Sequence, residues 1–302
     1  MLKKTRVFAV LVAANLMTLS APAVAEEAKA GDNAEQRINL SGKLRMLSQR
    51  IPAAACHLSK NQSSETAKTI LQDASAEFTA ILNALEFGDP ALNVAKPENR
   101  QKTLAQIADL KEKWAPMKEA AMATVGGSAT DAQRDYIFNQ NMTVLGSAVL
   151  LVSELSDQYS NPNAVSQANL MLVDISGRQR MLTQKMSKET CLVGTAHATP
   201  TMVEDMTQTM QVFEASLEAL KFGMPAVGIA PPPNGGISEA LEVVATDWQK
   251  VKPLLVEVAN GGALNEEQSI FKFEQLNTTM ASMNKAVGLY VTAVKPKNAQ
   301  LN

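Results

Sequence analysis

Apolar residues recur at three- and four-residue spacing along most of the chain, and the alternation typical of β-strands is scarce. The pattern predicts two successive sets of four helices. In the first set, the helices cover about 34–58 and 64–87, a segment around Trp114 that ends near 126–127, and about 131–158. In the second set, the chain restarts near Ser166 and its helices end near Val193, Phe222, Asn260 and Ala293.

The two sets are copies of each other at an offset of 135 residues. Six of the nine residues from Ser41 to Gln49 recur unchanged between Ser176 and Gln184. The prolines and glycines that end the second helix of each set also correspond. A repeat of this length indicates a duplicated domain. We therefore predict an all-α fold of two tandem up-down four-helix bundles related by a pseudo-twofold, with repeat 1 at 26–160 and repeat 2 at 161–302.

Residues 1–25 have the pattern of a secretory signal peptide. A basic start precedes an apolar stretch from Val7 to about Leu19, and Ala23-Val24-Ala25 matches a cleavage site. The apolar stretch is shorter than the about 20 residues of a membrane span. Removal of the segment leaves 25 Lys and Arg against 30 Asp and Glu, a net charge near −5 that argues against nucleic acid as a partner. We expect a soluble periplasmic protein.

The repeated phrase places an arginine on a small, polar helix face. On a wheel of about 100° per residue, the leucines of the first helix form one stripe. A second stripe surrounds Arg45, one turn after Gly42. A glycine inside a helix costs about 1 kcal/mol relative to alanine, so this face predicts the close approach of a backbone or a ligand. The candidate ligand-binding residues are Ser41, Gly42, Arg45, Ser48 and Gln49, with Ser176, Gly177, Arg180, Thr183 and Gln184 in the second copy.

An even number of alternating helices in each repeat makes the two first helices parallel. Arg45 would then face Arg180 across the pseudo-twofold, and two unpaired guanidinium groups would repel each other. A small oxyanion between them would relieve that repulsion, because a guanidinium presents a planar fork of donors to a planar anion. The alternative is a helical scaffold protein without a small-molecule ligand, in which the arginines are solvated or the polar stripe is a packing surface.

The remaining reactive residues suggest no further chemistry. Cys56 and Cys191 each follow their arginine by 11 residues, so a disulfide between them is possible, and so are two buried thiols. His57 and His197 do not occupy matching positions. We expect no metal site and no cofactor, and the chain shows no catalytic motif, so we do not expect an enzyme.

The phrase resembles the first-helix box of the PilJ-type sensory domain, which occurs in type IV pilus chemotaxis transducers and in nitrate/nitrite sensor kinases of the NarX and NarQ kind. That box reads roughly Asn-x-(small)-Gly-x-x-Arg-Met-x-Ser-x-Arg. The first copy here runs from Asn39 to Arg50 and the second from Asp174 to Lys185. Repeat 2 therefore departs from the box at both ends.

The resemblance implies an up-down sensory bundle in which the arginines matching Arg45 and Arg180 contact nitrate where two first helices meet. In those sensors a second subunit supplies the partner helix, whereas here the second repeat would supply it. We expect a periplasmic binding protein for nitrate or nitrite that reports to a membrane-bound sensor kinase, chemoreceptor or transporter.

Overall fold

The computed structural model describes residues 34–159 and 167–293, so the predicted signal peptide and the break at Asn161-Pro162-Asn163 lie outside the described residues. Within the described ranges the chain is helical, as the spacing predicts. The helices of the first repeat are α1 (Ala34–Ser59), α2 (Ser64–Phe87), α3 (Gln101–Val125) and α4 (Asp131–Tyr159). Those of the second are α5 (Gln167–Leu192), α6 (Met202–Phe222), α7 (Gly235–Ala259) and α8 (Glu266–Ala293).

The second helix of each repeat ends in the same way. Gly88 has a φ of 80° and Gly223 a φ of 79°, values that an L side chain rarely adopts. The N–H of each glycine donates to a carbonyl of the preceding turn, at Ala84 or at Ala219. A proline then opens a short 3-10 turn in both copies, η1 (Pro90–Leu92) and η2 (Pro225–Val227). These local stop signals explain why the predicted helix ends agree with the structure.

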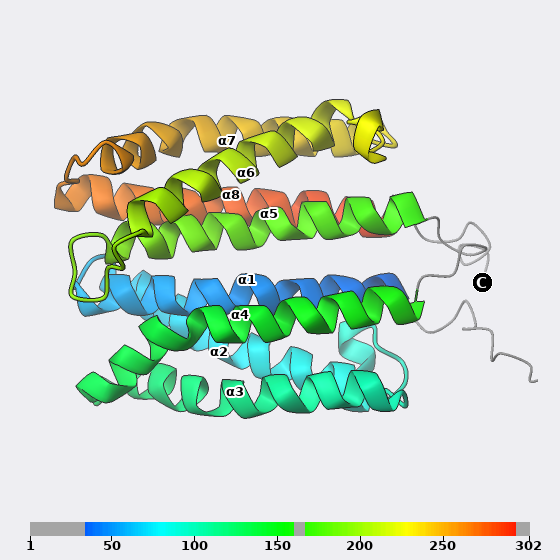
Figure 1. The fold of residues 1–302 in the computed structure, drawn as a ribbon, viewed down its shortest axis with the longest axis horizontal. Coiled ribbons are helices and arrows are strands. Elements are labelled where there is room, and N and C mark those ends of the chain that lie inside the picture. The colour runs from blue at the N-terminus through cyan, green and yellow to red at the C-terminus, as the bar shows by residue number, and fades with distance from the viewer. Residues whose placement is uncertain (1–33, 160–166, 294–302) are drawn as a thin grey trace, which may run out of the picture.

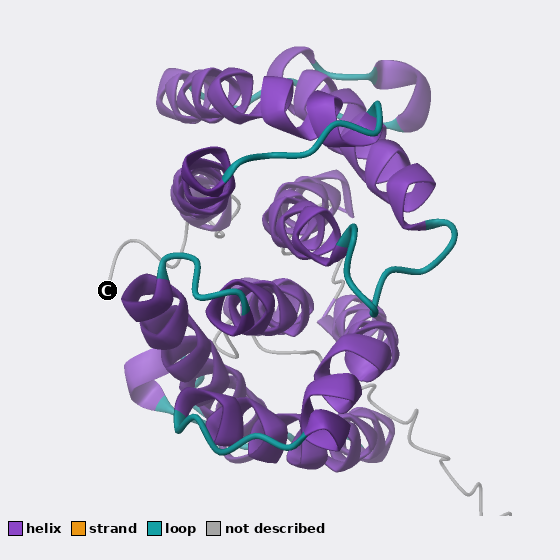
Figure 2. Cartoon of the chain, turned by 90° about the vertical axis from the view of Figure 1, so that its left-hand side faces the viewer, coloured by secondary structure: helices purple, strands orange, loops and turns teal. Residues whose placement is uncertain are grey.

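The two bundles lie one above the other, and α1 and α5 lie side by side in the middle of the molecule (Figure 1). Both run in the same direction, as the even number of helices predicts. The end-on view shows the helices of the molecule gathered into an upper and a lower group (Figure 2). Each bundle has its own aromatic core, where Trp114 stacks on Phe78 and Trp248 packs against Phe213.

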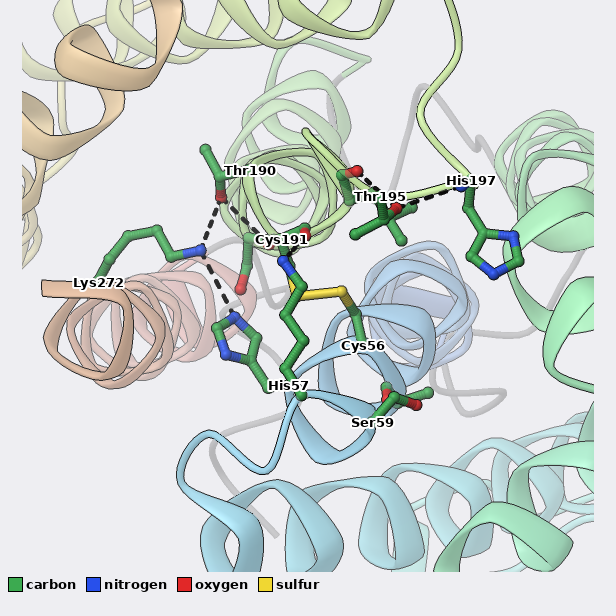
Figure 3. Close-up of a disulfide and its surroundings, with 12 residues drawn as sticks. Cys56, His57, Ser59, Thr190, Cys191, Thr195, His197 and Lys272 are labelled. Carbon is green, nitrogen blue, oxygen red and sulfur yellow. Dashed lines mark hydrogen bonds between the residues drawn. A yellow bond between two sulfur atoms is a disulfide. The ribbon is translucent and has the colours of Figure 1, made fainter. Parts of the chain in front are cut away.

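Covalent and polar contacts tie the ends of α1 and α5 together. Cys56 and Cys191 form a disulfide, with their Cα atoms 6.2 Å apart (Figure 3). Beside it, Nζ of Lys60 donates to the carbonyl oxygen of Cys191 at 2.6 Å. The two bundles are therefore linked at the end where α1 and α5 finish, and the repeated arginines lie farther back along the same pair of helices.

Candidate functional site

The polar residues of the repeated phrase meet at the seam between α1 and α5. Leu40, Leu44, Leu47 and Ile51 of α1 are buried in the core of the first bundle. The opposite, polar face of α1 is also buried, because α5 covers it. Every candidate ligand residue for which burial is described, from Ser41 to Gln184, lies in this seam or at its edge.

Arg45 and Arg180 converge on Gly42 and Gly177, the two glycines that recur at the same place in each repeat. A Cβ atom placed on Gly42 would lie 3.5 Å from Nη2 of both arginines, and one on Gly177 would lie 3.4 Å from Nη2 of Arg180 and 3.7 Å from Nη2 of Arg45. The arginines are only 4% and 1% exposed, respectively. The structure thus brings two guanidinium groups together away from solvent, and the missing glycine side chains leave room beside them. Neither arginine lies on a solvated face.

The expectation of two unpaired arginines is wrong for Arg45. Its Nη2 lies 2.7 Å from Oδ1 of Asp174, a residue of α5. The contact is an ion pair without the alignment of a hydrogen bond, and Nε of Arg45 has no hydrogen-bond partner among the described residues. Asp174 also pairs with Arg178 at the rim, 3.0 Å away. The sequence flags Asp174 as a departure from the family box, but the partner of its carboxylate depends on the packing of α5 against α1.

Arg180 is held by neutral acceptors. Its Nη1 donates to Oδ1 of Asn284 in α8 at 2.7 Å, and Nη2 makes a long contact of 3.4 Å with the carbonyl oxygen of Asn39. Asn39 is the first-repeat equivalent of Asp174. Arg45 therefore meets a carboxylate at this position of α5, whereas Arg180 meets a neutral asparagine at the equivalent position of α1. Burial, and next the positive charge of Arg45, lower the pKa of Arg180 to about 9. Burial also lowers the pKa of Arg45, although Asp174 opposes this.

The predicted neutral donors contribute less than the sequence suggests. The hydroxyls of Ser41, Ser48, Ser176 and Thr183 each donate to a carbonyl one turn back in their own helix. Hydroxyl side chains in helices commonly make this local bond. Oε1 of Gln49 accepts from Lys188 at 2.8 Å. Both amide atoms of the buried Gln184 lack a hydrogen-bond partner in the part of the chain that the structure describes.

His57, which the sequence singles out as one of two histidines, has a structural role away from the arginine pair. His57 stacks on Phe273, and burial lowers its pKa to about 2, so it is neutral. Among residues 34–159 and 167–293, no group of His, Cys, Asp or Glu side chains could hold a metal ion. Within the same ranges, no helix combines the length and the apolar character that crossing a membrane requires.

These features define a class of protein: a tandem pair of helical bundles with a buried, positively charged seam between equivalent helices. The family described as the type IV pili methyl-accepting chemotaxis transducer N-terminal domain matches residues 29–137 and 165–270. The chain belongs to this family and carries its sensory domain twice. The comparison with curated proteins finds no match.

Proposed function

We propose that the chain is a periplasmic binding protein for a small oxyanion, nitrate or nitrite in the first place, which binds between Arg45 and Arg180. The observation that supports this most is the convergence of two buried guanidinium groups on Gly42 and Gly177. Two buried cations with a single contacting carboxylate retain excess positive charge, and burying such charge is costly unless it is compensated. An added anion compensates it.

Asp174 sets how such an anion would bind. The ion would contact Nη2 of Arg180 and reach Arg45 by taking the place of the poorly aligned carboxylate of Asp174. Nε of Arg45, which has no partner within the described ranges, would be a further donor. The predicted residues Gly42, Gly177 and Gln184 would line this position, and the helix-bonded hydroxyls would keep their present contacts.

The size of the ligand limits its affinity. At a ceiling of about −1.5 kcal/mol for each of its four non-hydrogen atoms, nitrate cannot bind much more tightly than about −6 kcal/mol, a dissociation constant of tens of micromolar. Displacement of Asp174 weakens binding further, so we expect a value in the high micromolar to millimolar range. That range suits the detection or capture of an abundant nutrient. The bound state would be reported to a membrane-bound sensor kinase, chemoreceptor or transporter.

A thermal-shift panel of nitrate, nitrite, chloride, sulfate and formate tests this proposal. We expect nitrate or nitrite to raise the melting temperature of the wild-type protein, and we expect Arg180→Ala to abolish the effect. Arg134→Ala is the matched control, because Arg134 is a partly exposed arginine of α4 whose ion pair is with Asp131 and not with a residue of the site. A flat panel would favour the helical scaffold instead, and an anion effect that survives in Arg180→Ala would place the anion away from the arginine pair.

A further inference from the structure

A second polar cavity, separate from the arginine pair, lies where the first repeat meets the second. It has a volume of about 270 Å³ and opens between α4 on one side and α5, α6 and their connection on the other. Aromatic, leucine and methionine side chains form part of its wall. Its polar lining includes Asn141, Lys185, Lys188, Glu189, His197 and Asp205.

Lys188 brings a buried amine to this cavity. Nζ donates to Oε1 of Gln49 at 2.8 Å and to Oδ1 of Asn141 at 2.9 Å. Its remaining contact is with the sulfur of Met142 at 3.6 Å, and a thioether is a weak acceptor. Because an ammonium group has three donors, Lys188 can bind one stronger acceptor without losing its two present bonds.

Glu189 brings the complementary group to the same cavity. Oε1 is paired with Nζ of Lys185. Oε2 is buried and has no hydrogen-bond partner among the residues whose placement is described. A buried carboxylate oxygen without a donor is costly in a folded protein, so it calls for an explanation such as a water or a ligand. Glu189 lines the cavity, and rotation about the last bond of its side chain, a soft torsion, would turn Oε2 to a donor that enters it.

The packing of a bundle does not require these charges. The first-repeat equivalents of Lys188 and Glu189 are Ala53 and Ala54, which are fully buried. The same helix position therefore works with two methyl groups. Burial raises the pKa of Glu189 and lowers the pKa of Lys188 to about 8, so for both groups the cost of burial outweighs the effect of the neighbouring opposite charges.

The charges of the cavity are balanced overall. Lys185 and Lys188 face Glu189 and Asp205, and the ring of His197 packs against Phe138 with 4.6 Å between centroids. In Figure 3, His197 lies on the segment after α5 with its ring turned toward the neighbouring helix. A cavity with separated but balanced charges suits a ligand that carries one charge of each sign, and it disfavours a simple anion.

We propose that this cavity binds a free α-amino acid, with the carboxylate of the ligand on Nζ of Lys188 and its ammonium group on Oε2 of Glu189. The apolar part of the wall receives the side chain, so aliphatic or thioether amino acids such as leucine and methionine fit best. The volume is below the about 300–1,000 Å³ of drug-sized pockets, which agrees with a ligand of this size. The proposal does not depend on anion binding between the arginines.

Calorimetric titration of the wild-type protein with leucine and methionine at millimolar concentration tests the proposal. Two half-ligands serve as chemical controls: 3-methylbutylamine has the leucine side chain without the carboxylate, and 4-methylpentanoate has it without the amine. We expect the amino acids to bind and both half-ligands to bind at least about tenfold more weakly, because each loses one charge-assisted hydrogen bond.

Three variants complete the test. Glu189→Gln keeps the shape of the side chain and should weaken amino-acid binding by about tenfold or more. Glu239→Gln and Lys118→Ala, at exposed positions of α7 and α3, should leave it unchanged. If Glu189→Gln does not fold, the half-ligands still decide the question on the wild-type protein. Absence of binding by both leucine and methionine, equal binding of a half-ligand, or full binding to Glu189→Gln would overturn the proposal.

Discussion

Substitution of Asp174 by asparagine should convert the seam into a stronger anion site. The change restores the residue that the first repeat has at this position, Asn39, and removes the carboxylate that lies 2.7 Å from Nη2 of Arg45. An anion would then meet two cations without competition from a neighbouring carboxylate.

The structure sets the size of the effect. Once the carboxylate is gone, the guanidinium of Arg45 can donate a hydrogen bond to the anion. A hydrogen bond to a charged group contributes about 1.5–3 kcal/mol, and 1.4 kcal/mol corresponds to about tenfold in affinity. The side chain of Asp174 is 25% exposed, so solvent screens part of its interaction with Arg45 and the lower end of the range applies. We therefore expect Asp174→Asn to bind nitrate about tenfold more tightly than the wild-type protein, approaching the ceiling of tens of micromolar.

Isothermal titration calorimetry with sodium nitrate, at constant ionic strength, measures this change. In nitrate-free buffer the variant should also melt at a lower temperature than the wild-type protein, because Arg45 loses its partner. Saturating nitrate should remove this difference in melting temperature. Unchanged or weaker nitrate binding in a folded Asp174→Asn variant would refute the view that Asp174 competes with the ligand.

Three further predictions address stability and its link to the site. Gly42→Ala should raise the free energy of unfolding by up to about 1 kcal/mol, since alanine favours a helix and its Cβ would be in ordinary contact with the arginines; calorimetry should show weaker nitrate binding in the same variant, and unchanged binding would place the ligand elsewhere. Lys272 is fully buried beside Thr190 and His57 (Figure 3), and burial, then the charge of Lys60, lower its pKa to about 7. The folded state thus binds fewer protons than the unfolded state between about pH 7 and 10.5, so the stability of the wild-type protein should rise with pH in that range. In urea unfolding, Lys272→Met should reduce the slope of the unfolding free energy against pH by up to about 1.4 kcal/mol per pH unit. An identical slope in the variant and the wild-type protein would contradict a neutral amine at Lys272. The double variant Cys56→Ser with Cys191→Ser should lower the free energy of unfolding by as much as about 5 kcal/mol, because the disulfide closes a loop of 135 residues; equal urea midpoints for this variant and the wild-type protein would argue against the bond.

The fold was predictable because its signals are local. The helix ends follow from glycine and proline positions such as Gly88 and Pro90, and the two-bundle architecture follows from the repeat. The parallel arrangement of α1 and α5 follows from the even number of helices in each copy. The limits of the repeats at 26–160 and 161–302 stay predictions, since the boundary between them lies outside the described residues.

The candidate site was predictable only in part. Repetition identified Arg45 and Arg180, but the pairing of Arg45 with Asp174 joins helices that are distant in sequence and depends on how they pack. We expected the hydroxyls of Ser48 and Thr183 to face a ligand, but each donates to a carbonyl oxygen of its own helix. Lys188 and Glu189 have alanines, Ala53 and Ala54, as their first-repeat equivalents, so a search for repeated residues does not detect them.

A crystal structure of the protein with bound nitrate tests the central claim most directly. We expect a planar, three-oxygen ion between α1 and α5, with oxygens in hydrogen-bonding contact with Nη2 of Arg180 and with the guanidinium of Arg45, and with the carboxylate of Asp174 turned away. A nitrate-soaked crystal in which Asp174 still pairs with Arg45 and the space beside Gly42 and Gly177 holds no ion would contradict it.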